Sequence, residues 1–265
     1  MAKLLVFCES PADLETIQAL VERVLREQGP DWVRELLDGP PEAAQAFLEW
    51  MPDGEGRSYF DIHKVSDYAL RHKLRVDQGH FAGQPGEAGA LMGRTAFRVA
   101  REFALRGTEL AAVILVWDMD DQGQDRRKGL AQASTEARPL VSFEIVLGCP
   151  DPMREAWVLA GFEPETEAEQ ARLADLRQEL GFNPCEEAHR LDAKDEQAKR
   201  NPKRVLKKLT DDERDRAVRC WTEAPLVRLR ARGGPSGLAV FLDESARTLI
   251  PRLSGAPPKP SPAQD

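Results

Sequence analysis

Cysteine and histidine are scarce in this chain of 265 residues, which contains four of each. The cysteines, Cys8, Cys149, Cys185 and Cys220, lie far apart and form no C-x-x-C pair, and the chain has no H-E-x-x-H motif. The sequence therefore lacks the metal ligands of a zinc knuckle or a zinc hydrolase. It also lacks the cysteine spacing of a secreted disulfide framework. We expect free thiols in a reducing, cytoplasmic compartment.

The chain also lacks an excess of positive charge and a long apolar run. It carries 37 Lys and Arg against 45 Asp and Glu, which gives a formal net charge of −8. Because counterion release rewards clustered positive charge, this balance excludes a protein that coats nucleic acid through its overall charge, but it leaves a local basic groove open. The N-terminal run from Lys3 to Cys8 is too short to span a bilayer, so we expect no membrane partner.

Two common catalytic motifs are missing as well. No G-x-S-x-G elbow is present, which disfavours acyl transfer. The glycine-rich stretch 79–93 does not end in the G-K-[ST] of a phosphate-binding loop, and we interpret it as a mobile loop ahead of a helix.

Short apolar runs alternate with helical patterns through the first half of the chain. Lys3 to Cys8 and the seven apolar residues Ala111 to Trp117 are typical of strands buried on both faces, and Leu140 to Leu147 is rich in β-branched and aromatic residues. Helical patterns follow at 13–27 and 126–138. This rhythm predicts an α/β fold with a mostly parallel sheet flanked by helices, in which the run at Ala111 to Trp117 is the central strand.

The patterns divide the chain into three regions. Residues 1–150 are expected to form the α/β core, with an insertion rich in Pro, Gly and acidic residues at 29–58. Residues 151–254 are expected to form a helical elaboration, with helices at 153–160, 165–180, 202–209, 211–221 and 238–253 and an irregular polar segment at 182–201. The Pro-rich end, 255–265, is expected to be disordered.

Carboxylates follow two of the predicted strands. Glu9 comes directly after the first apolar run, and Asp118 and Asp120 follow the central one. Ligands of open α/β sheets bind beyond the carboxyl ends of the strands, so these side chains share a crevice if the two strands are neighbours. While the chain stays extended, Asp118 and Asp120 point the same way and suit a hard divalent cation. Helix capping is the alternative for an Asp after a strand, and we favour that role for Asp121 and Asp125.

Two stretches that carry these acids resemble the Toprim family, the metal-dependent catalytic domains of topoisomerases, primases and overcoming-lysogenization-type nucleases. They are Leu4-Leu-Val-Phe-Cys-Glu9-Ser and Val113-Ile-Leu-Val-Trp-Asp118-Met-Asp120. In that family a Glu follows the first strand and a D-x-D follows a later, central strand. The resemblance covers the predicted core and implies a Toprim-like sheet that binds Mg²⁺ or Mn²⁺ through Asp118, Asp120 and Glu9.

The second half resembles bacterial Toprim-like proteins of mobile and phage-defence settings at two places, Arg154-Glu155-Ala-Trp157 and Asn201-Pro202-Lys203. Glu155 opens a helix after the last predicted strand. It completes a second metal position there, or it is an ordinary Glu in a first helical turn. Trp157 is expected in the core.

One dense basic run stands out in the acidic chain, made of Lys199, Arg200, Lys203, Arg204, Lys207 and Lys208. On a helix, several of these side chains form a stripe that can follow a phosphate backbone, since affinity depends on the charge near the contact. A solvated helix face is the alternative. Lys203 is the best candidate for a phosphate contact, because Pro202 sets the start of the helix.

Together these residues and the resemblance predict a Mg²⁺-dependent nuclease that acts on nucleic acid. The resemblance alone implies a role as an effector of phage defence. Asp118 and Asp120 would hold the ion, Glu9 would act as general acid/base or as a further ligand, and Lys203 would neutralise charge in the transition state. Two alternatives stay open. One is a non-catalytic subunit that binds a partner protein of a defence complex, and the other is a haloacid-dehalogenase-type phosphatase with an Asp nucleophile.

Overall fold

The computed structural model describes residues 1–53, 56–75, 80–81 and 84–255. Within these residues, five strands form one sheet in which every pairing is parallel, with the order β2-β1-β6-β7 and with β3 beside the end of β1. The strands are β1 (Ala2–Cys8), β2 (Leu48–Met51), β3 (Phe60–Asp61), β6 (Leu110–Val116) and β7 (Glu144–Gly148). The predicted α/β fold with a parallel sheet is confirmed, and β6 occupies an interior position as expected.

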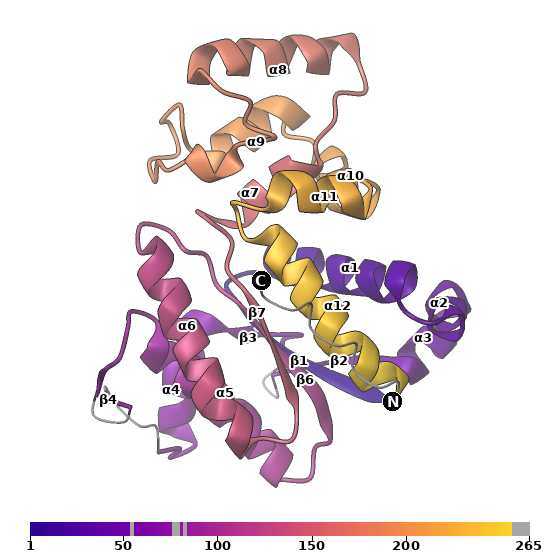
Figure 1. The fold of residues 1–265 in the computed structure, drawn as a ribbon, viewed down its shortest axis with the longest axis vertical. Helices are drawn as coiled ribbons and strands as arrows, with labels where there is room; N and C mark the ends of the chain where they lie inside the picture. Colours follow the sequence, from indigo (N-terminus) through magenta and orange to yellow (C-terminus); the bar gives the residue numbers. More distant parts are fainter. Residues whose placement is uncertain (54–55, 76–79, 82–83, 256–265) are drawn as a thin grey trace, which may run out of the picture.

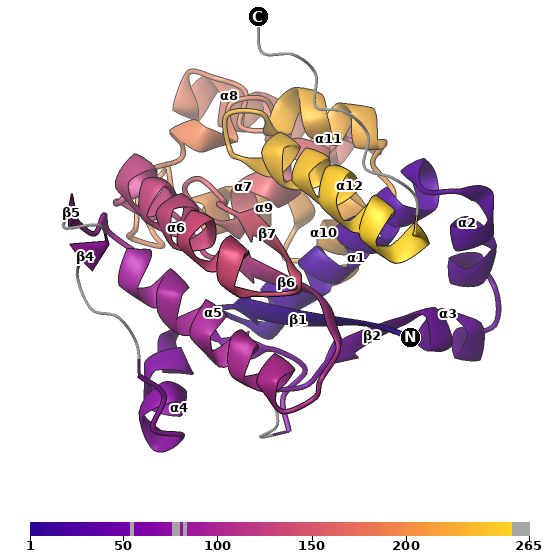
Figure 2. The same cartoon turned by 60° about the horizontal axis from the view of Figure 1, so that its bottom comes forward.

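The two long strands are apolar because helices cover both faces of the sheet. Alternate residues of β1 enter different cores, with Leu4 and Val6 on one side and Leu5 and Phe7 on the other. Figure 2 shows α1 (Pro11–Gln28) and α12 (Leu238–Ser254) on one face. The other face is covered by three helices, α4 (Val65–Arg71), α5 (Ala90–Leu105) and α6 (Gly123–Ala137).

The stretch 29–58, predicted to be an insertion with modest packing, in fact contributes to the sheet. After the short helices α2 (Asp31–Asp38) and α3 (Pro41–Phe47), strand β2 pairs with β1 from Ala2↔Leu48 to Leu5↔Met51. Its four residues are too few to show a periodic pattern, and the pairing depends on the open edge of β1. Within residues 59–65 only Phe60 and Asp61 pair with the sheet, as β3, and the short 3₁₀ helix η1 (Ile62–Lys64) follows.

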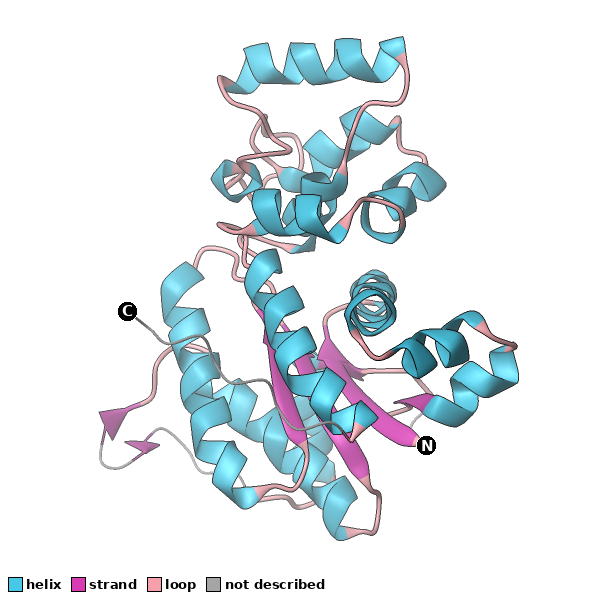
Figure 3. Cartoon of the chain, turned by 45° about the vertical axis from the view of Figure 1, so that its right-hand side comes forward, coloured by secondary structure: helices cyan, strands magenta, loops and turns pink. Residues whose placement is uncertain are grey.

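A group of helices, here called the helical part (residues 154–233), lies beyond the carboxyl ends of the strands (Figure 3). Its helices are α7 (Arg154–Gly161), α8 (Glu167–Leu180), α9 (Pro202–Thr210), α10 (Arg214–Thr222) and α11 (Leu226–Gly233). The sequence patterns predicted all of these except α11. The segment 182–201 is irregular as expected, apart from the 3₁₀ turn η3 (Ala188–Arg190). Helix α10 begins later than predicted, because Asp211 and Asp212 adopt positive φ angles of 57° and 61° after α9.

The helical part shares one continuous apolar core with the α1 and α12 face of the sheet. Trp157 lies in this core, as predicted. It stacks on Phe241 with ring centroids 5.0 Å apart, and its Nε1 donates to the carbonyl of Ser236 at 2.7 Å. The elaboration is therefore packed onto the sheet rather than tethered to it.

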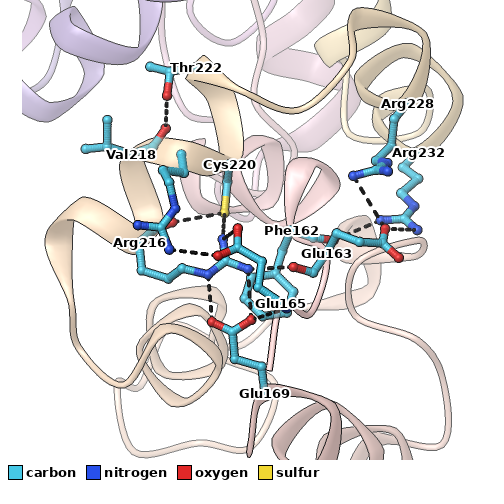
Figure 4. A network of polar contacts seen from close by, with 11 residues as sticks. Phe162, Glu163, Glu165, Glu169, Arg216, Val218, Cys220, Thr222, Arg228 and Arg232 are labelled. Atoms are coloured by element: carbon cyan, nitrogen blue, oxygen red, sulfur yellow. Dashed lines mark hydrogen bonds and ion pairs between the residues drawn. The ribbon is translucent and has the colours of Figure 1, made fainter. Parts of the chain in front are cut away.

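A buried ion pair ties three helices of the helical part together (Figure 4). On α10, Arg216 donates through Nε to Glu169 of α8 at 2.7 Å and through a terminal nitrogen to the carbonyl of Glu163, just after α7, at 2.6 Å. Its guanidinium also lies 4.4 Å from the centroid of the Phe162 ring. Both Arg216 and Glu169 are buried, so each charge is compensated by the other.

Two further expectations fall partly or wholly outside the described residues. The Pro-rich tail is described only as far as Gly255, and the glycine-rich stretch 79–93 only in part, with β4 (His80–Phe81) and β5 (Gln84–Pro85) paired antiparallel. In the described part of the chain, no helix is long and apolar enough to cross a membrane.

Candidate functional site

Two carboxyl groups meet where neighbouring strands end. Strands β1 and β6 run side by side with Phe7 opposite Leu115, Glu9 follows β1 directly, and Asp118 lies two residues beyond β6. A side-chain hydrogen bond joins Glu9 and Asp118. The structure thus brings these two predicted site residues together at the carboxyl edge of the sheet.

Asp118 is half-buried and sits among negative charges. Burial, with a further contribution from the nearby carboxylates of Glu9, Asp13 and Glu155, raises its pKa to about 9. The backbone N–H of Arg154, which donates to Asp118 Oδ1 at 3.0 Å, opposes this rise. At neutral pH Asp118 therefore keeps a proton, which it shares with Glu9. A cation at this position would replace that proton.

Glu9 is held by two nitrogen groups that contact the same oxygen. Trp117 Nε1 donates to Glu9 Oε1 at 3.0 Å, and His63 Nε2 lies 2.9 Å from that atom. Burial raises the pKa of Glu9, the charge of His63 opposes this shift, and Asp120 adds to it. The carboxyl group is thus oriented from two sides while part of it stays open to solvent.

Sequence reasoning missed His63, because it has no histidine partner at helical spacing. Its place follows from the sheet. Strand β3 pairs with β1 so that Asp61 lies opposite Cys8, which brings the turn after β3 next to Glu9. A two-residue strand carries too weak a pattern to reveal this register from sequence.

Asp120 does not point along with Asp118 as predicted, because the chain does not stay extended. Its φ angle is +48°, and its backbone N–H donates to the carbonyl of Pro152 at 2.8 Å. The carboxylate of Asp120 forms an ion pair with Arg126, at 2.9 Å. The guanidinium of Arg126 also lies 4.3 Å from the centroid of the Trp117 ring and donates a hydrogen bond to the carbonyl of Asp118. Asp120 therefore adds negative charge near Glu9, but its own carboxylate has a cationic partner.

Behind Asp118, Arg154 compensates two more buried acids. Its guanidinium lies 3.2 Å from Asp13 and 3.0 Å from Glu155, and it donates to Thr16 Oγ1 at 3.3 Å. Glu155, predicted either to complete a second metal position or to be an ordinary Glu, is buried and bound to this arginine. Sequence reasoning missed Asp13, which is the capping partner of Ser10 at the start of α1.

Lys203 is not brought to the acidic residues. It is exposed on α9, where it lines a surface pocket together with Lys207 and Asp212, and no described hydrogen bond or ion pair joins it to Glu9 or Asp118. The basic stripe around it is partly neutralised. The three ion pairs are Arg204–Glu179 at 3.0 Å, Lys208–Glu179 at 3.1 Å and Lys207–Asp212 at 2.8 Å. The solvated-face interpretation accounts for these contacts.

A different lysine contacts the loop that carries Asp118 and Asp120. Lys194 lies on the irregular segment 182–201, and its Nζ is 2.8 Å from Oδ2 of Asp121, the residue after Asp120. The hydrogen bond from Lys194 holds the pKa of Asp121 below its ordinary value. Asp121, predicted to be a helix-terminal charge, is thus the partner of a basic group from the helical part.

The donor atoms at the strand ends fit a small divalent cation. Glu9 and Asp118 offer only oxygen, and their mutual repulsion is the kind that a cation relieves. Mg²⁺ is commonly held by one or two carboxylates, while water and substrate phosphates complete its shell. Within the described residues, no set of three or more His, Cys, Asp or Glu side chains is arranged to hold an ion. The oxygens of Glu9 and Asp118 suit such an ion as a pair, but a three-carboxylate set with Asp120 is not preformed in the described part of the chain.

Comparison of the chain with family models, with curated proteins and with solved structures gives no match.

Proposed function

We propose that the protein is a Mg²⁺-dependent nuclease of the Toprim type that cleaves phosphodiesters of nucleic acid. One observation carries the proposal: Glu9 and Asp118 share a hydrogen bond at the carboxyl ends of neighbouring parallel strands. Burial together with the surrounding acids raises the pKa of Asp118 to about 9. Strongly perturbed carboxylates that meet at the carboxyl ends of parallel strands support a functional site.

In this proposal the chain's own residues orient the reacting groups. Glu9, held by Trp117 and His63, is the general acid/base, because its carboxyl group already shares a proton and part of it faces solvent. Asp118 and Glu9 would hold the Mg²⁺ or Mn²⁺, with Asp120 joining them if it leaves Arg126. When bound, the ion supplies Lewis-acid polarisation of the phosphate and a lower pKa for a water molecule.

Arg126 has a second role in the proposal. It neutralises Asp120 and stacks on Trp117, which places a fixed positive charge beside the acids. A guanidinium in this position can stabilise negative charge on a phosphate. The proposal includes a role in phage defence and a partner protein. Both are supported by the sequence resemblance to phage-defence proteins alone.

The test compares the wild-type chain with Asp118→Asn and with Asp125→Asn, which removes an exposed carboxylate on the first turn of α6. Each protein is incubated with DNA or RNA in EDTA, Mg²⁺ or Mn²⁺. We expect metal-dependent cleavage by the wild type and by Asp125→Asn, and none by Asp118→Asn. Absence of cleavage of both nucleic acids by the wild type would overturn the nuclease proposal.

Two further readouts separate the alternatives. Trapping of a covalent phosphate on Asp118 would favour the haloacid-dehalogenase-type phosphatase. Metal-induced stabilisation without cleavage of either nucleic acid would favour a subunit that binds a partner protein.

A further inference from the structure

The segment 182–201 crosses from α8 to α9 on the side of the molecule where the strands end. Figure 1 shows this connection above the upper end of α6. Lys194 contacts Asp121 in the loop after β6, and the charge of His189 acts on Asp151 in the loop after β7. The segment therefore approaches the loops after β6 and β7, and the first of these carries Asp118 and Asp120.

A buried side chain fixes the backbone at Lys194. Asn201 is 1% exposed, and its Nδ2 donates to the carbonyls of Ala193 at 3.0 Å and Lys194 at 3.3 Å. Its Oδ1 accepts from the backbone N–H of Arg204 at 3.0 Å, so the same residue caps α9. The helical part thus holds the base of the Lys194 side chain in place, while the ammonium group is exposed.

The contact between Lys194 and Asp121 is a weak one that a stronger anion can replace. The two side chains are 63% and 66% exposed, and exposed ion pairs contribute little in water. An ammonium group is a compact donor that suits phosphate oxygens. The neighbouring acids repel a phosphate backbone, so a positive charge beside them is needed for a nucleic acid to approach.

We propose that Lys194 is a phosphate-binding residue of this site, held by Asp121 in the free protein and transferred to a backbone phosphate when nucleic acid binds. The proposal rests on the proposed function for the class of ligand. Asp121 then has a second effect, because it competes with the substrate for the same ammonium group. The two residues should therefore act on binding in opposite directions.

The experiment measures binding of a short fluorescent DNA duplex, and of an RNA of the same sequence, in EDTA over a series of salt concentrations. Lys194→Gln should weaken binding on the order of three- to tenfold and reduce the slope of log K against log salt by about one unit. Asp121→Asn should tighten binding by a similar factor. The double variant should bind more like Lys194→Gln than like Asp121→Asn, because the main effect of Asp121 is its competition for the lysine.

A matched control is available on α6. Lys128 and Asp125 form an ion pair with the same exposed fractions, 63% and 66%, at 3.8 Å. Lys128→Gln and Asp125→Asn should leave the affinity and the salt slope close to those of the wild type. If the Lys194 and Asp121 variants behave like these controls, Lys194 is an ordinary surface residue and the inference is wrong.

The outcomes also separate this inference from the proposed function. Metal-dependent cleavage that Asp118→Asn abolishes, together with unchanged binding in Lys194→Gln, would overturn only the role of Lys194. A wild-type chain that neither binds nor cleaves DNA or RNA would overturn both. Thermal melting shows whether each binding variant retains its fold. We expect the fold to be retained, since the side chains of both ion pairs, Lys194–Asp121 and Lys128–Asp125, are exposed.

Discussion

Glu9 and Asp118 hydrogen-bond to each other across the ends of two neighbouring parallel strands. In the folded protein Asp118 keeps its proton up to about pH 9, whereas an unfolded chain releases it near its ordinary pKa of 3.8. Between these values the folded state binds one more proton than the unfolded state. The free energy of unfolding without metal should therefore fall as the pH rises, by up to about 1.4 kcal/mol per pH unit from this group.

Asp118→Asn should remove this contribution, so that the free energy of unfolding of the variant depends less steeply on pH. Urea unfolding at several pH values within this window measures the effect, and Asp125→Asn should keep the wild-type slope. Saturating Mg²⁺ should also flatten the wild-type profile, because the ion takes the place of the proton. Equal slopes for the wild type and Asp118→Asn would show that Asp118 ionises normally.

Breaking the buried pair of Arg216 and Glu169 should destabilise the helical part. Glu169→Gln leaves the arginine buried with a neutral partner, and we expect a loss of about 3 kcal/mol. Arg219→Gln is the control, because Arg219 pairs with Glu165 in a largely exposed contact at 2.9 Å and should change stability by less than about 1 kcal/mol. Denaturant melts compare the two. Similar losses of unfolding free energy in the two variants would mean that the buried pair contributes no more to stability than the exposed one.

Gly161, at the end of α7, lies directly against the backbone of α10. A Cβ added at Gly161 would lie 1.8 Å from the carbonyl oxygen of Cys220, so Gly161→Ala must push the two helices apart. We expect a loss of about 2–3 kcal/mol. At Gly234, where the nearest atom to an added Cβ is 3.9 Å away, alanine should be tolerated without loss. Comparable melting temperatures for the two variants would argue against this close approach.

Asn201 performs two tasks, and Asn201→Ala should affect both. Loss of the cap on α9 costs about 1 kcal/mol, and loss of the bonds to Ala193 and Lys194 frees the connecting segment. Thr166→Ala removes only a cap, that of α8, and should cost a similar amount of stability. Limited proteolysis near Lys194 should therefore accelerate in Asn201→Ala but not in Thr166→Ala. Equal cleavage rates would contradict the anchoring role.

The sequence by itself determined the sheet and the ends of its two central strands. Runs as apolar as those of β1 and β6 are stable only when helices bury both faces, and that requirement leads to a parallel α/β sheet. In the sequence, Glu9 and Asp118 come directly after these runs. Their convergence needed only one further condition, that the two strands be neighbours, and the structure meets it.

Only the tertiary structure decided how the remaining site residues lie. The backbone leaves the extended path at Asp120, where the backbone N–H donates to the carbonyl of Pro152 in the loop after β7. The Asp120 carboxylate is then paired with Arg126. His63 and Lys194 reach the acids through a two-residue strand and an irregular segment, where no periodic pattern exists. Such contacts between segments distant in sequence arise from packing, and local sequence patterns do not encode them.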